Sequence, residues 1–187
     1  WNMNTDFSKS EELESLIEDR IATLPNTLGF IVVHKGEIVS ENYYNSSESN
    51  SINVWSVTKS FISTLIGQAV DMDMLYDPDS SASYFFPDVS EGYLDTITMH
   101  DILSMSSGYV DQFIPSNPFT FFFDPSQWWA LNSTETLLSM DHSEPGSFFY
   151  NNSACHLNSH ALYYGTGLTP SDFADIYLFP HLGINNP

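Results

Sequence analysis

The chain is short of basic residues and of cysteine, and each shortage excludes a class of function or structure. Lys and Arg number 4 against 24 Asp and Glu, so the formal net charge at pH 7 is −20. A field of this sign repels nucleic acids and anionic membranes, and we therefore expect no function in binding polyanions. The single cysteine, Cys155, permits no disulfide within the chain, so the fold must depend on packing. Its apolar, helical context favours a small core residue over a nucleophile.

The sequence also lacks the marks of a membrane protein and of a metalloprotein. No stretch approaches the ~20 apolar residues of a membrane span, so none is predicted. His156 and His160 have a spacing that suits a metal, but no carboxylate lies between them and no third ligand is evident. We predict surface or hydrogen-bonded histidines, with no metal and no other cofactor. This sequence shows no signal peptide, which is also the state of a protein whose signal has been removed. Its acidity favours a periplasmic or secreted protein over a cytoplasmic one.

The beginning of the chain predicts a helix followed by a β-hairpin. With 187 residues, 42% of them hydrophobic, the chain can bury a core, and its length predicts one domain. A capping box at Ser8–Glu11 predicts a helix that Pro25 ends. Two β-rich runs, Gly29–His34 and Glu37–Tyr44, flank the turn Lys35-Gly36 and predict antiparallel strands. A two-stranded hairpin alone is marginal, so we expect a further polypeptide segment or a neighbouring copy to complete the sheet.

The segment Ser56-Val57-Thr58-Lys59 has the arrangement of a serine nucleophile with its base. It opens an apolar helical stretch, Phe61–Leu75, whose buried stripe is predicted to comprise Ile62, Leu65, Ile66 and Ala69. Residues three apart share a helix face, so the Lys59 amine can take the proton of the Ser56 hydroxyl or stabilise its alkoxide. At the helix start, the Ser56 backbone N–H can face an oxyanion. S-x-x-K also occurs by chance in many chains, so the surrounding sequence must decide whether this one is catalytic.

A second cluster, Tyr150-Asn151-Asn152, precedes another apolar helical stretch, Ala154–Tyr164. A tyrosine and an amide two residues apart on one loop can point into a single cleft. Tyr150 could then pass a proton between Ser56 and a leaving group, while Asn152 donates to a substrate carbonyl and accepts from Lys59. The alternative is an ordinary aromatic residue followed by a helix cap.

The remaining segments predict short helices and loops. Thr98 and Asp101 form a capping box, and a further helix is expected at Ser133–Met140. Thr169-Pro170-Ser171-Asp172 combines an N-cap, a proline at the first helical position and an acid in the first turn. It predicts a last helix that Pro180 ends.

Residues 119–129 concentrate aromatic side chains: Phe119, Phe121, Phe122, Phe123, Trp128 and Trp129. Aromatic residues usually pack a core, and we expect this for most of the cluster. One or two members could instead wall an apolar acyl or amine pocket between Ser56 and Tyr150. Trp128 and Trp129 are the candidates for that substrate contact.

Together, the two motifs resemble the serine hydrolases that include class C β-lactamases, DD-peptidases, related esterases and nylon-oligomer hydrolases. The resemblance runs from about Leu28 to the end of the chain, and further segments carry it: Asn53–Ser60, Ile97–Gly108, Phe148–Asn152 and Phe179–Ile184. It implies an α/β (α+β) fold of the β-lactamase/transpeptidase type, with an antiparallel sheet flanked by helices and a mainly helical region at residues 77–167. Residues 1–187 would form a single domain of this kind, truncated at its C-terminus.

One motif of that family has no counterpart here. The family carries a Lys or His, a small residue and Gly on a later strand, whereas Gly165-Thr166-Gly167 comes too soon and lacks the basic residue. The resemblance therefore implies the N-terminal half to two-thirds of an enzyme, with an incomplete sheet.

These observations lead to two hypotheses about function. In the first, the chain is a serine hydrolase that forms an acyl-enzyme on an ester or amide bond, of the esterase, amidase, β-lactamase or D-amino peptidase type. Ser56 attacks, Lys59 and Tyr150 handle protons, and Asn152 orients a small-molecule substrate. No Lys or Arg follows Lys59, so a neutral or ammonium-bearing substrate suits the chain better than a carboxylate. In the second, it is a non-catalytic binding or assembly module, or an inactive fragment.

Overall fold

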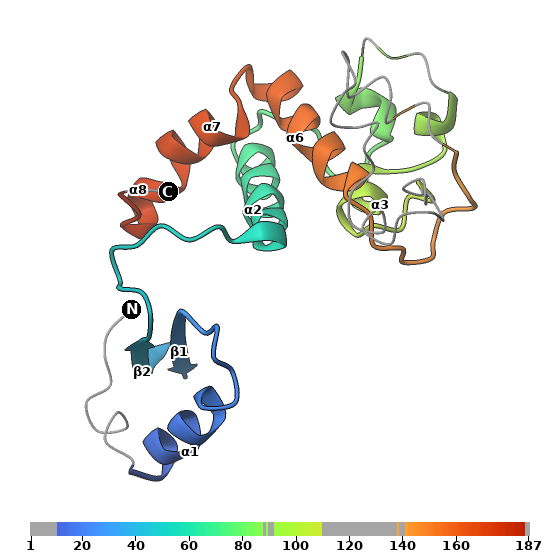
Figure 1. The fold of residues 1–187 in the computed structure, drawn as a ribbon. Helices are drawn as coiled ribbons and strands as arrows, with labels where there is room; N and C mark the ends of the chain where they lie inside the picture. Colours follow the sequence, from blue (N-terminus) through green and yellow to red (C-terminus); the bar gives the residue numbers. More distant parts are fainter. Residues whose placement is uncertain (1–10, 88, 90–91, 110–137, 139–140, 186–187) are drawn as a thin grey trace. The chain divides into compact units, whose positions relative to one another are not determined.

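A computed structural model of the chain describes residues 11–87, 89, 92–109, 138 and 141–185 (Figure 1). It consists of two compact units, residues 1–53 and residues 54–187. No helix within the described ranges is long and apolar enough to cross a bilayer.

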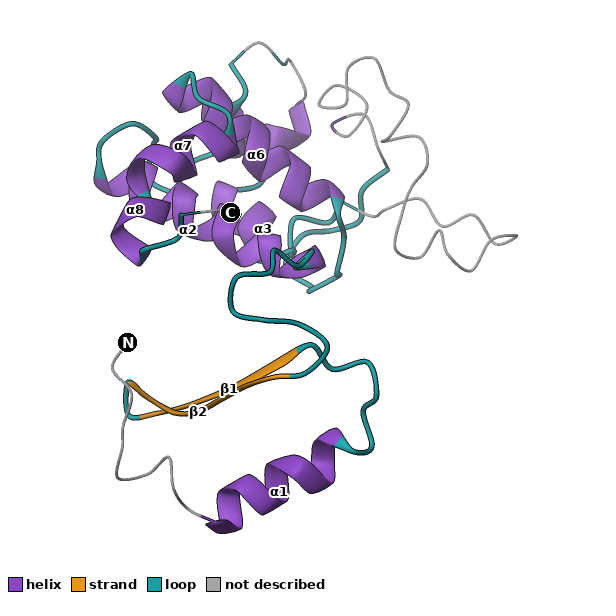
Figure 2. Ribbon diagram, turned by 60° about the vertical axis from the view of Figure 1, so that its left-hand side comes forward, coloured by secondary structure: helices purple, strands orange, loops and turns teal. Residues whose placement is uncertain are grey.

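The first unit combines a helix with a β-hairpin. Helix α1 spans Glu11–Ile21, and the antiparallel strands β1 and β2 span Gly29–His34 and Glu37–Tyr43 (Figure 2). Both residues of the turn, Lys35 and Gly36, have positive φ values of 50° and 82°. Two-residue hairpin turns of this kind match the twist of the strands that they join. The predicted hairpin is confirmed, with β2 one residue shorter than expected.

Helix α1 ends earlier than the sequence predicts. We expected it to run up to Pro25, but regular helix stops at Ile21 and continues as turns in which the Thr23 N–H donates to the Arg20 carbonyl. Such tighter bonds commonly finish a helix. The Ser40 hydroxyl donates to the Glu14 carboxylate at 3.3 Å, which links β2 to α1. The capping residues Ser8 and Ser10 lie outside the described residues.

The sheet has two strands within the described part of the chain and is not closed. Val32 lies opposite Ser40 and Val33 opposite Ile38, so Val39 is an extra residue between the pairs. This bulge places Val39 fully inside the unit. The expected α/β class with an incomplete antiparallel sheet is therefore correct.

The second unit packs its helices around one apolar core. Helices α2 (Thr58–Asp71), α6 (Ser153–Thr166) and α7 (Pro170–Tyr177) contact one another (Figure 1). The buried residues of α2 are Ile62, Leu65, Ile66 and Ala69, which are the four that the periodicity predicts. The helix lies three or four residues earlier than Phe61–Leu75, because the regular turns begin at Thr58, within the Ser56–Lys59 motif.

Short helices complete this unit. They are the 3-10 helices η1 (Trp55–Val57), η2 (Ala82–Phe85) and η3 (Gly92–Asp95), and the α-helices α3 (Met99–Leu103) and α8 (Phe179–Leu182). The Thr98–Asp101 capping box is present at α3, as predicted. The expected helix at Ser133–Met140 lies outside the described residues apart from Leu138, which is buried.

The prediction that Pro180 ends the last helix is wrong. Thr169 caps α7 and accepts from the Asp172 N–H, as expected, but α7 already ends at Tyr177. Pro180 lies in the first turn of the next helix, α8. A helix leaves its first N–H groups without internal partners, so proline is tolerated there and can begin a helix as readily as it stops one.

Candidate active site

The candidate nucleophile lies on a tight turn that leads into α2. Trp55 has a φ of 48°, a conformation that costs a bulky residue about 1–3 kcal/mol. The 3-10 turn Trp55–Val57 follows, and the Thr58 N–H donates to carbonyls of this turn as α2 begins. Ser56 is exposed, and Lys59 is half-buried in the first turn of α2. The strained residue and the short turn present both side chains on one side of the helix start.

Four predicted site residues come together within hydrogen-bonding distance. The Tyr150 hydroxyl donates to Ser56 Oγ at 2.7 Å across 94 positions of sequence. Lys59 Nζ donates to the same oxygen at 3.3 Å and to Asn152 Oδ1 at 2.8 Å. The Lys59 ammonium also lies 5.1 Å from the centroid of the Tyr150 ring, within the range of a cation–π contact. Ser56 Oγ is therefore the acceptor of two polar hydrogens.

The loop that carries Tyr150 and Asn152 is anchored by the residue between them. Asn151 is buried, and its amide nitrogen donates to the carbonyls of Phe149 at 2.9 Å and Tyr109 at 3.3 Å. Its side-chain oxygen accepts from the Ala154 N–H at 2.7 Å, which caps the start of α6. These bonds of Asn151 fix the loop backbone, and the side chains on either side of it, Tyr150 and Asn152, bond to Ser56 and Lys59 respectively.

Sequence reasoning gave Asn151 no role. The signal that could have found it is an Asn three residues before a helical N–H, which is a capping position. Asn152 is the residue next to the helix, but its side chain makes no cap hydrogen bond. The two asparagines have separate tasks.

The surroundings of Tyr150 shift the pKa of its hydroxyl downward. Burial alone would raise the pKa of Tyr150, but the hydrogen bond with Ser56 and the hydrogen bond and charge of Lys59 outweigh burial and lower that pKa below its usual value. Among the described residues, no carboxylate lies within 4 Å of the Lys59 amine. The salt bridge found in this part of the chain joins two other residues, His100 and Asp79. Within the described part of the chain, the charge of Lys59 therefore acts on Tyr150 with no carboxylate in salt-bridge range to neutralise it.

Cys155 is half-buried on the first turn of α6. Burial raises the pKa of the Cys155 thiol, and the charge of Lys59 opposes this only in part. A thiol with a raised pKa is a poor nucleophile at neutral pH. Cys155 is therefore a poor candidate for a nucleophile.

The remaining candidates are two tryptophans and two histidines. Trp128 and Trp129 lie outside the described residues. Burial, followed by the charge of His156, lowers the pKa of His160. Within the described part of the chain, no group of three or more His, Cys, Asp or Glu residues could hold a metal ion.

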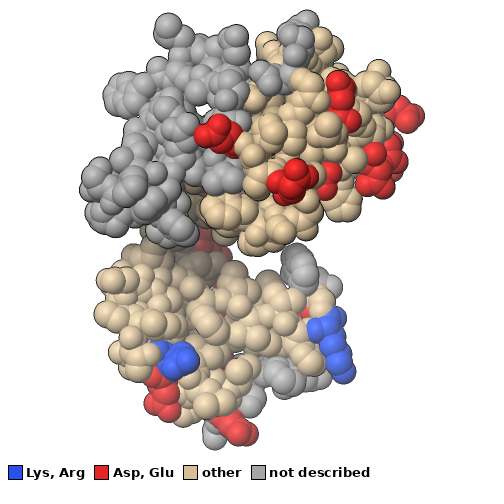
Figure 3. Space-filling model, turned by 90° about the vertical axis from the view of Figure 1, so that its right-hand side faces the viewer, with Lys and Arg blue, Asp and Glu red and all other residues tan. Residues whose placement is uncertain are grey.

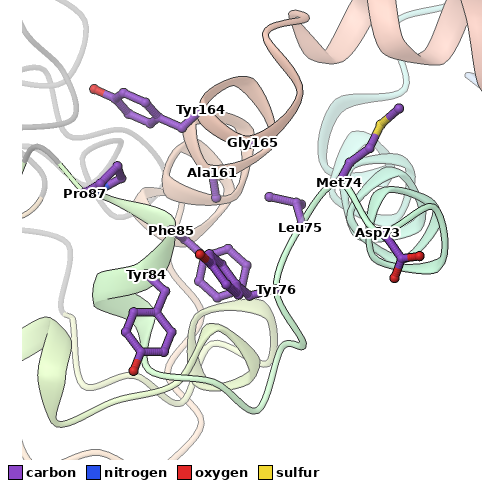
Figure 4. A pocket seen from close by; sticks show the side chains of 10 residues that line it. All are labelled: Asp73, Met74, Leu75, Tyr76, Tyr84, Phe85, Pro87, Ala161, Tyr164 and Gly165. Atoms are coloured by element: carbon purple, nitrogen blue, oxygen red, sulfur yellow. The ribbon is translucent and has the colours of Figure 1, made fainter.

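A cavity of about 490 Å³ lies elsewhere in the second unit, between the chain that follows α2, η2 and α6 (Figure 4). The rings of Tyr76 and Phe85 meet edge to face there, with centroids 6.1 Å apart. Its lining comprises Asp73, Met74, Leu75, Tyr76, Tyr84, Phe85, Pro87, Ala161, Tyr164 and Gly165. Because none of the four clustered residues lines it, this cavity is separate from the Ser56 site.

The fold is that of the β-lactamase-like class of proteins. The chain belongs to the Beta-lactamase family, whose model matches residues 16–187. Among functionally curated proteins, no sequence matches the chain.

Solved structures share this fold. A protein from Bacteroides dorei DSM 17855, provisionally assigned as a β-lactamase, aligns with a TM-score of 0.72 and 20% identity over 93% of this chain and 51% of its own. A class C β-lactamase aligns with a TM-score of 0.69 and 18% identity over 97% and 51%. A Bacillus anthracis protein, provisionally assigned as a 6-aminohexanoate-dimer hydrolase, aligns with a TM-score of 0.66 and 18% identity over 89% of this chain and 46% of its own. The chain thus spans about half the length of these structures.

Proposed function

We propose that this protein is a serine hydrolase that cleaves an ester or amide bond through an acyl-enzyme on Ser56. One observation carries the proposal: Ser56 Oγ lies 2.7 Å from the Tyr150 hydroxyl and 3.3 Å from Lys59 Nζ. A hydroxyl with two proton-handling groups in reach is the arrangement of an activated nucleophile. Membership of the Beta-lactamase family supports hydrolase chemistry in general.

The geometry supports Tyr150 as the group that receives the Ser56 proton. In its phenolate form, which the lowered pKa favours, Tyr150 accepts that proton while Ser56 Oγ bonds to the substrate carbonyl carbon. The carbonyl oxygen becomes an oxyanion, and in this proposal the Ser56 backbone N–H forms half of its binding site. Tyr150 then protonates the leaving alcohol or amine as the bond to it breaks. Water attacks the acyl-enzyme by the reverse route, which releases the acid and restores Ser56.

Lys59 and Asn152 support these steps. The Lys59 ammonium stabilises the phenolate, and its hydrogen bond to Asn152 Oδ1 fixes the amine between the two motifs. The Asn152 side-chain oxygen accepts from Lys59, so in this proposal the NH₂ group of the same amide is the donor to a substrate carbonyl. Asn152 thereby orients the substrate in the proposal.

The charges and exposed rings favour a neutral, apolar substrate or one with an ammonium group. Lys59 is the one Lys or Arg of residues 54–187, and it already bonds to Ser56 and Asn152. Acidic side chains are spread over the visible face of this unit (Figure 3). Trp55 beside Ser56 is 68% exposed, and Phe148 near Tyr150 is 71% exposed. Such rings can contact an apolar acyl or amine group, whereas a carboxylate meets unfavourable charge.

Labelling with a fluorophosphonate tests the proposal, because the reagent needs only an activated hydroxyl. Intact-mass analysis of the full natural chain should show one adduct on Ser56, which Ser56→Ala abolishes. Ser63→Ala, which removes an exposed hydroxyl from the same helix, is the matched control and should label normally. An adduct that persists in Ser56→Ala would move the nucleophile elsewhere. Absence of any adduct in the natural chain would favour a non-catalytic module.

We also propose that another polypeptide segment, from the same protein or from a neighbouring copy, pairs with the β1–β2 hairpin. Two facts support this: the sheet has two strands within the described residues, and the chain spans about half the length of similar structures. Open strand edges carry unpaired backbone groups that favour further pairing.

A further inference from the structure

The segment that delivers Tyr150 runs along a second stretch of chain. The Ser143 N–H donates to the Gly108 carbonyl at 2.8 Å, and the Gly146 N–H to the Ser106 carbonyl at 2.8 Å. The Phe149 N–H donates to the Met105 carbonyl at 2.9 Å. A β-bridge between residues 109 and 142 closes the far end of this ladder. Tyr150, the next residue after the ladder, is therefore placed by residues 105–109 as well as by the cap that joins its loop to α6.

Tyr93, on η3, connects the two sides of the ladder. Its hydroxyl lies 2.5 Å from the Ser107 carbonyl oxygen and 3.0 Å from the Ser143 carbonyl oxygen, and its proton is shared between these two acceptors. Its ring stacks on His142, with centroids 3.5 Å apart and planes 9° from parallel. One side chain thus contacts residue 107 on one segment and residues 142 and 143 on the other.

Gly108 leaves the space that this contact requires. Its φ is +82°, and a Cβ atom there would overlap with the Ser143 carbonyl oxygen and crowd the Tyr93 hydroxyl. Gly146, on the opposite side of the ladder, also has a positive φ, +104°, but a Cβ there would meet nothing within 4 Å. The close approach at Gly108 therefore involves the Ser143 carbonyl and the Tyr93 hydroxyl, the two groups that this hydrogen bond joins.

We propose that Tyr93 is a positioning residue: by hydrogen-bonding to the Ser107 and Ser143 carbonyls, it fixes residues 142–149 and so holds the Tyr150 hydroxyl within reach of Ser56. The proposal rests on the proposed hydrolase function. The distance from Tyr150 to Ser56 Oγ is 2.7 Å, and a shift of about 1 Å would carry it beyond hydrogen-bonding range. Tyr93 touches no reacting atom and acts through Tyr150.

Tyr93→Phe in the full natural chain is the first test, since it keeps the stacked ring and removes only the hydroxyl. We expect kcat for p-nitrophenyl butyrate to fall about tenfold while KM changes by less than about twofold, because the nucleophile loses its aligned proton acceptor. Tyr84→Phe is the matched control, because Tyr84 is exposed in the same unit and its ring contact is with Tyr76. An unchanged kcat in Tyr93→Phe would overturn the proposal.

A double-mutant cycle separates positioning from loss of stability. In a Tyr150→Phe background, Tyr93→Phe should cause no further loss of kcat, because the hydroxyl that it positions is already gone. Two losses that multiply would show that Tyr93 acts independently of Tyr150 and would refute the positioning role.

An NMR titration of ¹³C-labelled tyrosine gives a readout that does not need turnover. If Tyr93 positions Tyr150, the Tyr150 pKa should move toward its ordinary value in Tyr93→Phe, because the hydrogen bond with Ser56 weakens. An identical titration in both proteins would overturn the positioning proposal. Failure of fluorophosphonate labelling in the natural chain would instead overturn the hydrolase proposal, so the two failures are distinguishable.

Gly108→Ala disturbs the same contact in a different way, because the added Cβ would overlap with the Ser143 carbonyl oxygen and crowd the Tyr93 hydroxyl. We expect it to reproduce the loss of kcat and the change in Tyr150 titration. Gly146→Ala is its matched control, since it has the same unfavourable sign of φ without the overlap. Equal effects of the two substitutions would argue that backbone strain, and not the Tyr93 contact, governs Tyr150.

Discussion

The Lys59 ammonium donates a 2.8 Å hydrogen bond to Asn152 Oδ1, and this bond joins the start of α2 to the start of α6. The preceding residue, Asn151, is buried, and its side chain bonds to backbone groups instead of to Lys59. Two adjacent asparagines therefore divide the work: one is bonded to the catalytic candidate, and the other holds the backbone.

Asn152→Ala should slow the reaction with fluorophosphonate without unfolding the protein. Lys59 loses the oxygen that orients it, and the substrate loses an amide donor, so we expect about a 10- to 1000-fold lower labelling rate. The thermal midpoint should stay close to that of the natural protein, as measured by circular dichroism. A normal labelling rate would remove Asn152 from the site.

Asn151→Ala should instead lower stability. The substitution removes the cap of α6 and leaves the Tyr109 and Phe149 carbonyls without this donor, which should cost about 1–3 kcal/mol of unfolding free energy. Urea denaturation measures the loss, and Asn152→Ala is the control at the adjacent position. Equal stability in the two variants would contradict the anchoring role.

The pH dependence should report the ionisation of Tyr150. Because its pKa in the folded protein is below the ordinary tyrosine value of 10.0, kcat/KM should rise with pH through this lowered pKa as the phenolate forms. Tyr150→Phe should lose this rising limb. A profile that keeps the same limb in Tyr150→Phe would assign it to another group.

The same lowered pKa predicts a change of stability with pH. Between the folded-state pKa and 10.0, the unfolded chain binds more protons at Tyr150, so unfolding free energy should rise with pH relative to Tyr150→Phe. This gain should vanish below the folded-state pKa. Denaturation of both proteins at neutral and alkaline pH measures the difference.

Two isoleucines test the core of the second unit. Ile66 on α2 has 0% exposure, and Ile176 on α7 has 52%. Ile66→Ala should cost about 2–5 kcal/mol of unfolding free energy through lost burial and a cavity, whereas Ile176→Ala should cost under about 1 kcal/mol. Similar losses in both would contradict the packing of α2.

The open hairpin predicts that residues 1–187 alone are poorly active. Without a further strand beside β1 or β2, the sheet leaves backbone groups unpaired and prone to association. We expect isolated residues 1–187 to self-associate in size-exclusion chromatography and to hydrolyse p-nitrophenyl acetate slowly. Monomers as active as a longer natural chain would refute this.

Features that depend on near neighbours in sequence were predicted well. The i to i+3 spacing places Lys59 beside Ser56 in any helix, and the stripe that includes Ile62 and Leu65 follows from helical period alone. The turn at Lys35-Gly36 likewise needs only local backbone preference. By contrast, the contact of Tyr150 with Ser56 joins distant segments, and we expected it from the family resemblance together with the two motifs.

Features set by tertiary packing were missed. Nothing local to Asn151 shows that its amide will meet the Tyr109 carbonyl, and nothing local to Tyr93 shows that it bridges residues 107 and 143. Pro180 misled for a different reason, since proline suits both the end of one helix and the first turn of the next. Such choices are made by the surrounding fold.

The placement of Lys59 has a consequence for proteolysis. Trypsin cuts after Lys or Arg, and residues 54–187 offer it this one position, in the first turn of α2. To enter the protease, the side chain must leave Ser56 and Asn152, and the helix turn must open. Native-state digestion at the bond after Lys59 therefore measures how often the hydrogen bonds of Lys59 to Ser56 and Asn152 open.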